Sequence, residues 1–316
     1  MTDPDPTPLE LSILIVTYNS RRHVRDCLES IQRTIGDIQR EVIVVDNASQ
    51  DGTPDILRNE FPDVRLIANP ENPGFACSVN QGISQSQGSY ILLLNPDTTV
   101  LPKTLITLLN EMKESPETGL LGGRLLNTDR SLQQSFGYEV TFWSEIARKT
   151  FFNLWENYRF APVGWILSFL HSRKREVDWV KGACMLLRRQ ALSDVKLLDE
   201  NFFMYLEDAD LCQRIRQSGW QIHYTPEAEV IHFGGGSVRS NREQCALEYR
   251  RSQLHYFKKH LRENSLKALR MYLGFKMRKN ILAVNFRQWI GWGDPGPLAE
   301  KKQFLQETLS LVQNFQ

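Results

Sequence analysis

Runs of apolar residues alternate with amphipathic segments through the first part of the chain. The apolar runs lie at 11–17, 41–46, 64–68 and 90–94. Continuous runs of this kind are typical of strands that are buried on both faces of a sheet. Between them the apolar spacing predicts helices, including two over 75–87 and 102–114. Strands that alternate with helices predict an α/β fold with a mostly parallel, right-handed sheet.

The pattern changes in the second half of the chain. Residues 136–178 are rich in aromatic side chains, and we expect them to form a variable insertion that lies over the functional site. A strand that leads into a helix follows at 177–192, and 220–237 predicts two short strands and a glycine-rich loop. The organisation that we expect is a disordered lead at 1–9, an α/β domain at 10–240 that contains the insertion, and a helical, basic C-terminal region at 241–316.

Composition is that of an ordinary globular protein, with 41% hydrophobic and 24% charged residues and a net charge of +1 that gives no indication of nucleic-acid binding. The charge is uneven, since nine Lys and Arg stand against one Glu between Lys258 and Arg287. We expect His255 and His260, in this basic stretch, to be solvated.

Cysteine usage and the N-terminus bear on the compartment. Five scattered cysteines without a CxxC pair argue against a zinc ribbon or a disulfide framework and indicate a reducing environment. The acidic, proline-rich N-terminus does not have the pattern of a signal sequence. No apolar run reaches the roughly 18 residues of a membrane span. These features predict a cytoplasmic protein.

Polar residues follow the ends of the predicted strands, which is where open α/β sheets bind ligands. Thr17 and Tyr18 follow the first strand, and Asp46 ends the second. An acid at this position can accept a hydrogen bond from the N3–H of a pyrimidine base, or it can cap the turn that follows. Neither strand is followed by a GxGxxG segment, which weakens a nicotinamide-dehydrogenase interpretation.

Asn95 and Asp97 follow the fourth predicted strand. An Asp with a neighbouring amide can bind Mg²⁺ or Mn²⁺, with water and diphosphate oxygens completing the shell. A tight Asn-Pro-Asp turn without a metal explains the same residues. His232 stands before glycines 234–236, and it is either a structural histidine or a second metal ligand.

Residues 202–220 carry three carboxylates, on Glu207, Asp208 and Asp210, between an aromatic cluster and a short amphipathic helix. Gly219 stands where a left-handed residue ends a helix. The acids therefore fall in the first turn, where the helix dipole favours ionised carboxylates. The segment is either the site of a general base or a well-capped surface helix, and Asp210 is the acid that we expect to hold the helix start.

The order of these segments is more specific than any one of them. The chain resembles the family 2 glycosyltransferases of the GT-A fold, most closely their rhamnosyltransferase-like branch, over roughly residues 10–240. In chain order, the resemblance is carried by SILIVTYNS, EVIVVDNASQDGT, NPGFACSVNQGI, ILLLNPDTTV, WVKGACMLLRRQAL, DENFFMYLEDADLCQRIRQSGW and HFGGGS. It implies a Rossmann-like, mostly parallel sheet flanked by helices, and inverting transfer of a sugar from a nucleotide-diphosphate donor to an acceptor hydroxyl.

The resemblance also implies roles for residues on the donor side. Asp46 corresponds to the acid that recognises the base. Asp97 corresponds to the metal-binding Asp of the family's DxD motif, whose first acid is here Asn95. The metal, Mg²⁺ or Mn²⁺, is therefore expected to be held more weakly or to rely on His232. The residues that the resemblance assigns to the donor nucleotide are Thr17, Tyr18, Asp46 and Asn95.

On the acceptor side, Asp208 corresponds to the catalytic base, and Glu207 is expected to position the acceptor. Trp179 and Gly182 resemble the acceptor-side wall of the family. A non-catalytic nucleotide-sugar-binding protein is the main alternative, but it would need no base. A sugar-nucleotide nucleotidyltransferase would carry a glycine-rich loop after the first strand, where this chain has TYNSRRHV.

The resemblance leaves the partners open. Both dTDP-rhamnose and UDP-linked sugars suit Asp46, and the acceptor is a saccharide, free or lipid-linked, in a growing surface polysaccharide. The basic tail with Trp289 and Trp292 is suited to an anionic membrane at the inner face of the plasma membrane. The alternative is an amphipathic helical tail that packs on the domain or on the second subunit of a homodimer.

Overall fold

The computed structural model describes residues 9–34, 36–145, 147, 161–234 and 242–315. Most of the predicted lead and part of the predicted aromatic insertion lie outside these ranges. The predicted domain boundary at 240 also lies outside them and stays a prediction.

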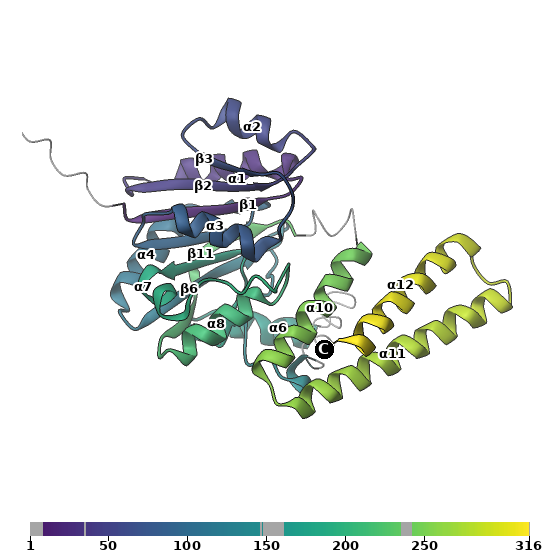
Figure 1. Cartoon of the computed structure of the whole chain (residues 1–316). Coiled ribbons are helices and arrows are strands. Elements are labelled where there is room, and N and C mark those ends of the chain that lie inside the picture. The colour runs from purple at the N-terminus through teal and green to yellow at the C-terminus, as the bar shows by residue number, and fades with distance from the viewer. Residues whose placement is uncertain (1–8, 35, 146, 148–160, 235–241, 316) are drawn as a thin grey trace, which may run out of the picture.

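Within the described ranges, the centre of the N-terminal part is a mixed sheet (Figure 1). Its strands are β1 (Leu11–Thr17), β2 (Arg40–Asn47), β3 (Arg65–Asn69), β4 (Tyr90–Leu94), β5 (Thr98–Val100), β6 (Thr118–Leu126), β8 (Arg175–Glu176), β10 (Cys184–Arg188) and β11 (Gln221–His232). Their order is β3-β2-β1-β4-β10-β6-β11-β5, with β8 against β11. Two further strands, β7 (Phe136–Gly137) and β9 (Trp179–Val180), form a small separate sheet.

Strands β1 to β4 are parallel, whereas β10 runs antiparallel to both of its neighbours, β4 and β6. The α/β prediction is confirmed, and the reversal of β10 was not predicted. Because β10 runs opposite to β4, the residues that precede β10 lie at the edge where β4 ends, with Cys184 opposite Leu94. This brings 179–183 to the carboxyl ends of the parallel strands.

Helices cover both faces of the sheet because side chains alternate along buried strands. Ile13 and Ile15 pack into the core of one face, and Leu14 and Val16 into the core of the other. The first face is covered by α1 (Arg21–Thr34), α2 (Thr53–Glu60) and α4 (Thr104–Glu114). The second is covered by α3 (Phe75–Gln85), α7 (Arg189–Val195) and α8 (Glu207–Gln217).

The prediction of two short strands at 220–237 is wrong, because β11 is one strand of 12 residues. Its register against β6 shifts between Tyr224 and Glu229. Pro226 lies in this irregular stretch, and a proline cannot donate a ladder hydrogen bond. The sequence signal for a strand break is therefore real, but the chain passes it as an irregularity within one strand.

The C-terminal region consists of α10 (Arg242–His260), α11 (Glu263–Trp289) and α12 (Pro295–Asn314). A further helix, α6 (Ala161–Leu170), precedes β8. Figure 1 shows α11 and α12 as a hairpin that projects away from the sheet. Their shared core reaches the α8 side through Phe202 and Ala209. No helix in the described ranges is long and apolar enough to cross a bilayer.

The prediction that His255 and His260 are solvated is wrong. The His260 side chain is 5% exposed, and its Nε2 lies 2.6 Å from Asp210 Oδ1. His255 stands edge-on to the ring of Phe202, with Nε2 3.3 Å from Asp199 Oδ2. His255 faces Asp199 and His260 faces Asp210, because α10 packs against the domain rather than extending into solvent.

Candidate active site

A cleft of about 480 Å³ opens at the carboxyl ends of β1 and β4. It gathers side chains from segments that are far apart in the sequence. The predicted site residues that line it are Asn95, Asp97, Trp179, Gly182, Glu207, Asp208 and His232. The cavity is not lined by Thr17, Tyr18 or Asp46. These residues lie beside it, next to loop residues that do line it.

Asp46 is held rigidly at the end of β2. Its carboxylate is 1% exposed, its Oδ1 accepts a hydrogen bond from Thr17 Oγ1 at 2.8 Å, and its Oδ2 accepts one from the Ser49 amide at 2.9 Å. Thr17 and Asp46 are register partners on adjacent strands. Tyr18 is 45% exposed, and Asn19 continues from it into the cleft. Each Asp46 oxygen can accept a further hydrogen bond, so the pair with Thr17 still has capacity for a ligand.

Asp97 and His232 meet where β5 pairs with the end of β11. His232 Nε2 lies 3.4 Å from Asp97 Oδ1, and Asn95 Nδ2 lies 3.3 Å from the same ring nitrogen. Burial works to raise the pKa of Asp97, but the hydrogen bond and charge of His232 outweigh it and leave the pKa below its usual value. The Asp97 carboxylate is therefore ionised at neutral pH.

Gln133 fixes the orientation of the His232 ring. Gln133 Nε2 donates to Asn127 Oδ1 at 3.1 Å, so its Oε1 is turned toward His232 Nδ1, 2.6 Å away. Lys181 Nζ donates to the same Oε1 at 3.3 Å. Gln133 Oε1 accepts the proton of Nδ1, so Nε2, which hydrogen-bonds to Asp97, is the ring nitrogen that would give up its proton to a metal. Metal-bound histidines are commonly held in this way by their second ring nitrogen.

These donors fit a divalent cation whose shell is only partly supplied by the protein. Within the described ranges there is no group of three or more His, Cys, Asp or Glu side chains that could hold a metal. The carboxylate of Asp97 and the imidazole nitrogen of His232 are suitable first-row metal ligands. The remaining ligands would have to come from water and from a bound substrate.

The turn before α8 is strained. Tyr205 and Leu206 have φ values of 72° and 65°, and for such side chains this left-handed conformation is unfavourable. The turn is held from the other side by α10, because Ser252 Oγ donates to the carbonyl oxygen of Met204 at 2.7 Å. The rings of Tyr205 and Tyr249 also lie 5.7 Å apart, edge to face.

The loop before α3 holds the other end of the same turn. The Phe75 amide donates to the carbonyl oxygen of Phe203 at 2.8 Å. Gly74 has a φ of 94°, and a Cβ there would lie 2.7 Å from the Phe203 ring and 2.9 Å from its carbonyl oxygen. Only glycine fits this close approach, which explains the NPGF segment that precedes α3.

Asp208 is oriented by two backbone amides. Its Oδ2 accepts a hydrogen bond from the Gly182 amide at 3.1 Å, and its Oδ1 accepts one from Ala209 at 2.7 Å. A Cβ on residue 182 would lie 3.8 Å from Oδ2, in ordinary van der Waals contact, so residue 182 lies directly beside the carboxylate. Trp179, which also lines the cleft, is fixed by a hydrogen bond from Nε1 to the Tyr138 carbonyl oxygen at 2.9 Å.

Glu207 is a buried acid of the cleft with a strongly raised pKa. It is 8% exposed, and its Oε2 has no hydrogen-bond partner among the described residues. Burial, together with the neighbouring charge of Asp208, raises the pKa of Glu207 to about 8. The expectation that the helix dipole keeps this acid ionised is wrong, because the cost of burying the charge exceeds the effect of the dipole. Glu207 is protonated at neutral pH and can donate a hydrogen bond.

Asp210 has a different position from the one expected. The residue that caps α8 is Leu206, whereas Asp210 lies within α8 and its side chain is fully buried between α8 and α10. Its carboxylate lies 2.6 Å from His260, 2.7 Å from Lys259 and 2.8 Å from Arg214. These partners hold the pKa of Asp210 below its usual value despite burial. Asp210 therefore joins α10 to the domain and does not hold the start of the helix. Gly219 does end α8 with a left-handed φ of 93°, as predicted.

The sequence analysis did not identify several side chains of the cleft. Lys181 lies within the WVKGACM segment and His23 within TYNSRRHV, so their positions next to site residues could have indicated them. Gln133 and Tyr249 come from a loop and from the C-terminal helices, and no motif indicates either.

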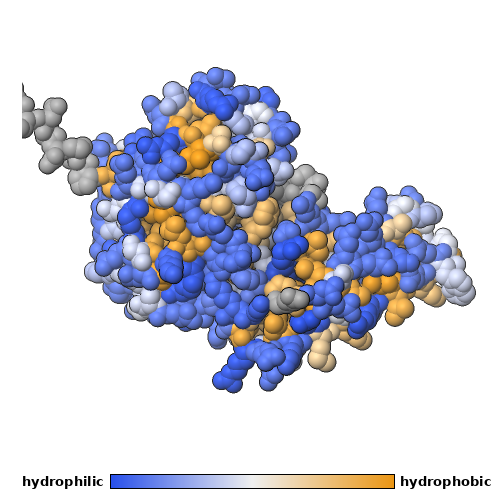
Figure 2. Space-filling view, in the orientation of Figure 1, coloured by the Kyte–Doolittle hydropathy of each residue, from blue (hydrophilic) through white to orange (hydrophobic). Residues whose placement is uncertain are grey.

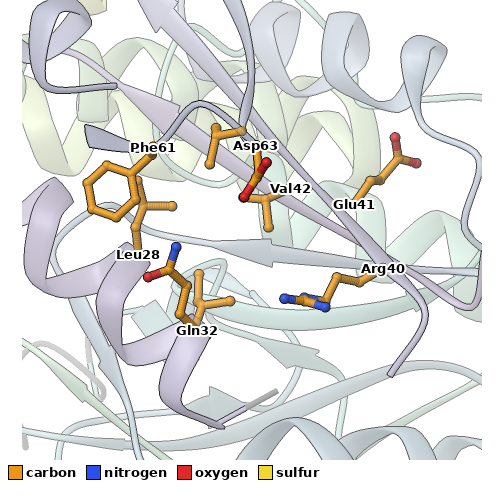
Figure 3. A pocket seen from close by; sticks show the side chains of 9 residues that line it. Leu28, Gln32, Arg40, Glu41, Val42, Phe61 and Asp63 are labelled. Carbon is orange, nitrogen blue, oxygen red and sulfur yellow. The ribbon is translucent and has the colours of Figure 1, made fainter. Parts of the chain in front are cut away.

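A second cavity of about 300 Å³ lies under β2 between α1 and the loop after α2. Figure 3 shows an apolar part formed by Leu28, Val42 and Phe61, with Arg40 and Asp63 at its margin. None of the predicted site residues lines it. Its chemistry is therefore separate from that of the cleft.

Sequence comparison identifies the family. The model of Glycosyl transferase family 2 matches residues 12–195. The chain therefore belongs to glycosyl transferase family 2, and the predicted glycosyltransferase activity is confirmed at this level.

Two relatives show the range of the family. The chain is 29% identical over 243 residues to the N-acetylglucosaminyl-diphospho-decaprenol L-rhamnosyltransferase of Mycobacterium tuberculosis, covering 72% of this chain and 77% of the relative. It is 25% identical to the low-salt glycan biosynthesis hexosyltransferase Agl10 of Haloferax volcanii, covering 71% and 67%. The predicted resemblance to the rhamnosyltransferase-like branch agrees with the first of these.

Solved structures confirm the GT-A fold. The mannosyltransferase PcManGT of Pyrobaculum calidifontis, in complex with GDP-Man and Mn²⁺, aligns with a TM-score of 0.57 at 17% identity and covers 98% of this chain and 89% of that one. TarS of S. aureus in complex with UDP-GlcNAc aligns with a TM-score of 0.52 at 18% identity, covering 81% and 69%. At these identities the likeness concerns the fold alone.

Proposed function

We propose that the protein transfers a sugar from a nucleoside-diphosphate donor to a saccharide hydroxyl with inversion, and that Asp208 is the general base. The observation that carries this proposal is that one cleft holds the oriented Asp208 carboxylate together with Asp97 and His232. A protein that only bound nucleotide sugars would have no use for the oriented carboxylate. In a single displacement the acceptor oxygen attacks the anomeric carbon, the bond from that carbon to the diphosphate oxygen breaks, and Asp208 takes the hydroxyl proton.

The donor nucleotide is assigned to the ends of β1 and β2. Asp46 accepts the N3–H of a pyrimidine, Thr17 orients Asp46, and Tyr18 covers the base. A pyrimidine suits both a dTDP- and a UDP-linked sugar, and similarity to a rhamnosyltransferase supports rhamnose as the transferred sugar.

Asp97 and His232 are proposed to hold Mg²⁺ or Mn²⁺, with Asn95 turning its amide to the diphosphate. Such a cation would offset the negative charge that develops on the leaving diphosphate. Support comes from Gln133, which binds Nδ1 and so turns Nε2 toward Asp97, and from the Mn²⁺ in the complex of a protein with the same fold. Lys181, beside Gln133, supplies positive charge to the same region.

The acceptor is proposed to be a lipid-linked saccharide in surface polysaccharide synthesis, reached at the inner face of the plasma membrane. The name of the mycobacterial relative includes such an acceptor. Trp179 forms the wall on which the acceptor sugar stacks, Gly182 lies beside the base, and the protonated Glu207 donates a hydrogen bond to the acceptor.

Asp208→Asn tests the proposal. We expect nucleoside-diphosphate release in the presence of acceptor to fall on the order of 10²–10⁴-fold, since general-base catalysis contributes that much. Donor affinity measured by calorimetry should be unchanged, because the amide keeps the size of the carboxylate. Asp63→Asn, at an exposed position near the second cavity, is the matched control. Turnover of Asp208→Asn at the wild-type rate would show that another group takes the proton.

A further inference from the structure

Helix α11 has two apolar faces. The inner face packs against α10 and α12 through Leu269, Leu273, Met277 and Val284. The outer face, here called the outer stripe, is exposed and consists of Met271, Phe275, Leu282, Phe286 and Trp289. At roughly 100° per residue the outer stripe spans only about 60° of the helix surface. The inner face already stabilises the hairpin, so the outer stripe is not needed for folding.

The outer stripe is large and strongly exposed. Trp289 is 81% exposed and Met271 76%. From Met271 to Trp289 it extends about 27 Å along the helix, at roughly 1.5 Å per residue. Figure 2 shows apolar patches among hydrophilic residues along the hairpin. An exposed apolar face of this extent indicates a binding surface.

Exposed aromatic residues continue the stripe at both ends. Trp143 is 75% exposed, and Phe142 beside it contacts Tyr272 of α11 edge to face at 6.0 Å. Beyond the other end of the helix, Trp292 is 65% exposed and lies 5.2 Å from the Arg287 guanidinium. Tryptophan beside a cation is typical of side chains at the boundary between lipid and water.

Charge distinguishes between the possible occupants of this surface. α11 contains six Lys and Arg and one acid, Glu263. Arg278 and Lys279 border the outer stripe, one on each side of its arc. In a twofold dimer through this stripe the same basic helix would face its own copy, which brings like charges together. An anionic surface has the complementary charge and also accepts the apolar residues.

We propose that the outer stripe of α11 binds the surface of an anionic lipid bilayer. No described helix can span the bilayer, so the helix lies along the interface. α10 is packed against α11 and also carries Tyr249, which lines the cleft. The idea that this docking presents a lipid-linked acceptor to the cleft rests on the proposed function. The binding of the outer stripe to the bilayer does not.

Vesicle co-sedimentation of the full chain, without donor or acceptor, tests the proposal. The vesicles are pure phosphatidylcholine, or phosphatidylcholine with an equal amount of phosphatidylglycerol. We expect binding to the phosphatidylglycerol vesicles that weakens at high salt. The triple variant Phe275→Ser/Leu282→Ser/Trp289→Ser should bind on the order of a hundredfold more weakly. Ile106→Ser, an exposed apolar residue on α4, should bind as wild type.

Further variants separate the possible results. Arg278→Glu/Lys279→Glu should weaken binding to the anionic vesicles, and Asp208→Asn should bind them normally, so that a failed transferase assignment does not affect this test. Calorimetry of nucleotide binding to the triple variant checks that it is folded. Equal vesicle binding by wild type and the triple variant would overturn the proposal. The proposal would also be overturned if the wild type formed a dimer in analytical ultracentrifugation and did not bind vesicles, and if the triple variant abolished that dimer.

Discussion

Glu207 should make the stability of the protein fall as the pH rises above neutral. In the folded state burial raises the pKa of Glu207 to about 8, whereas an ordinary glutamate has a pKa of about 4.3. Between these two values the folded protein holds a proton that the unfolded chain has lost. The free energy of unfolding therefore decreases with rising pH in this window, and the contribution of Glu207 is most favourable below the unfolded pKa.

The size of the effect follows from linkage. One proton that is bound only in the folded state gives a slope of about 1.4 kcal/mol per pH unit. From pH 6 to pH 8 the loss is about 2 kcal/mol, since half of the folded molecules have already lost this proton at pH 8, and this is a substantial part of the stability of a typical domain. Glu207→Gln has nearly the same shape and does not titrate, so this slope should disappear in the variant.

The measurement is urea denaturation of wild type and Glu207→Gln at several pH values between 5 and 9. The difference between the two unfolding free energies should grow in favour of the variant as the pH rises. Glu114→Gln removes an exposed carboxylate from α4 and should leave the wild-type slope in place, because that carboxylate is hydrated in both states. Parallel pH profiles for wild type and Glu207→Gln would refute the reasoning.

Three further results are expected. Asp210→Asn should lower the free energy of unfolding by roughly 3–5 kcal/mol in urea at neutral pH, since it breaks a buried ion pair with Lys259. Because the pKa of Asp210 is lowered, this stabilisation fades as the pH falls below the ordinary Asp pKa. An unchanged urea midpoint would contradict the assignment. Gln133→Leu should weaken Mn²⁺ binding in the presence of nucleoside diphosphate by about 10–100-fold in calorimetry, because His232 loses its orienting partner; equal affinity would remove Gln133 from the site. Asp46→Ala should reduce uridine diphosphate affinity about tenfold or more while leaving pyrophosphate binding unchanged, and an equal loss for both ligands would argue against base recognition.

The sequence predicted the sheet well because its strands are buried on both faces. The run that contains Ile13, Leu14 and Ile15 has apolar partners on either side, so burial requires an unbroken apolar sequence. The positions of polar residues at the strand ends were also readable, since Asp46 ends one such run and Asp97 comes shortly after another. The order of the motifs along the chain then indicated the family.

What the sequence did not show depends on contacts between distant segments. The apolar residues of β10 carry no local signal of the antiparallel direction in which it pairs with β4 and β6. Gln133 is a loop glutamine outside any motif, and its role becomes apparent only from its contact with His232. The burial of His260 follows from its contact with Asp210, 50 residues earlier in the chain, and the pKa of Glu207 follows from the packing around it.

The strained turn at Tyr205 and Leu206 has a consequence for how the chain can be divided or recombined. Its conformation is imposed by Ser252 from α10 and by the Gly74 loop, so Asp208, the proposed base, is aligned by parts on both sides of the molecule. Shortening the chain before α10 would keep every acid of the cleft and release the turn that aims them. A chimera with a helical extension from a relative would need to exchange the turn and α10 together. The catalytic unit in this enzyme is larger than the segment that its family motifs define.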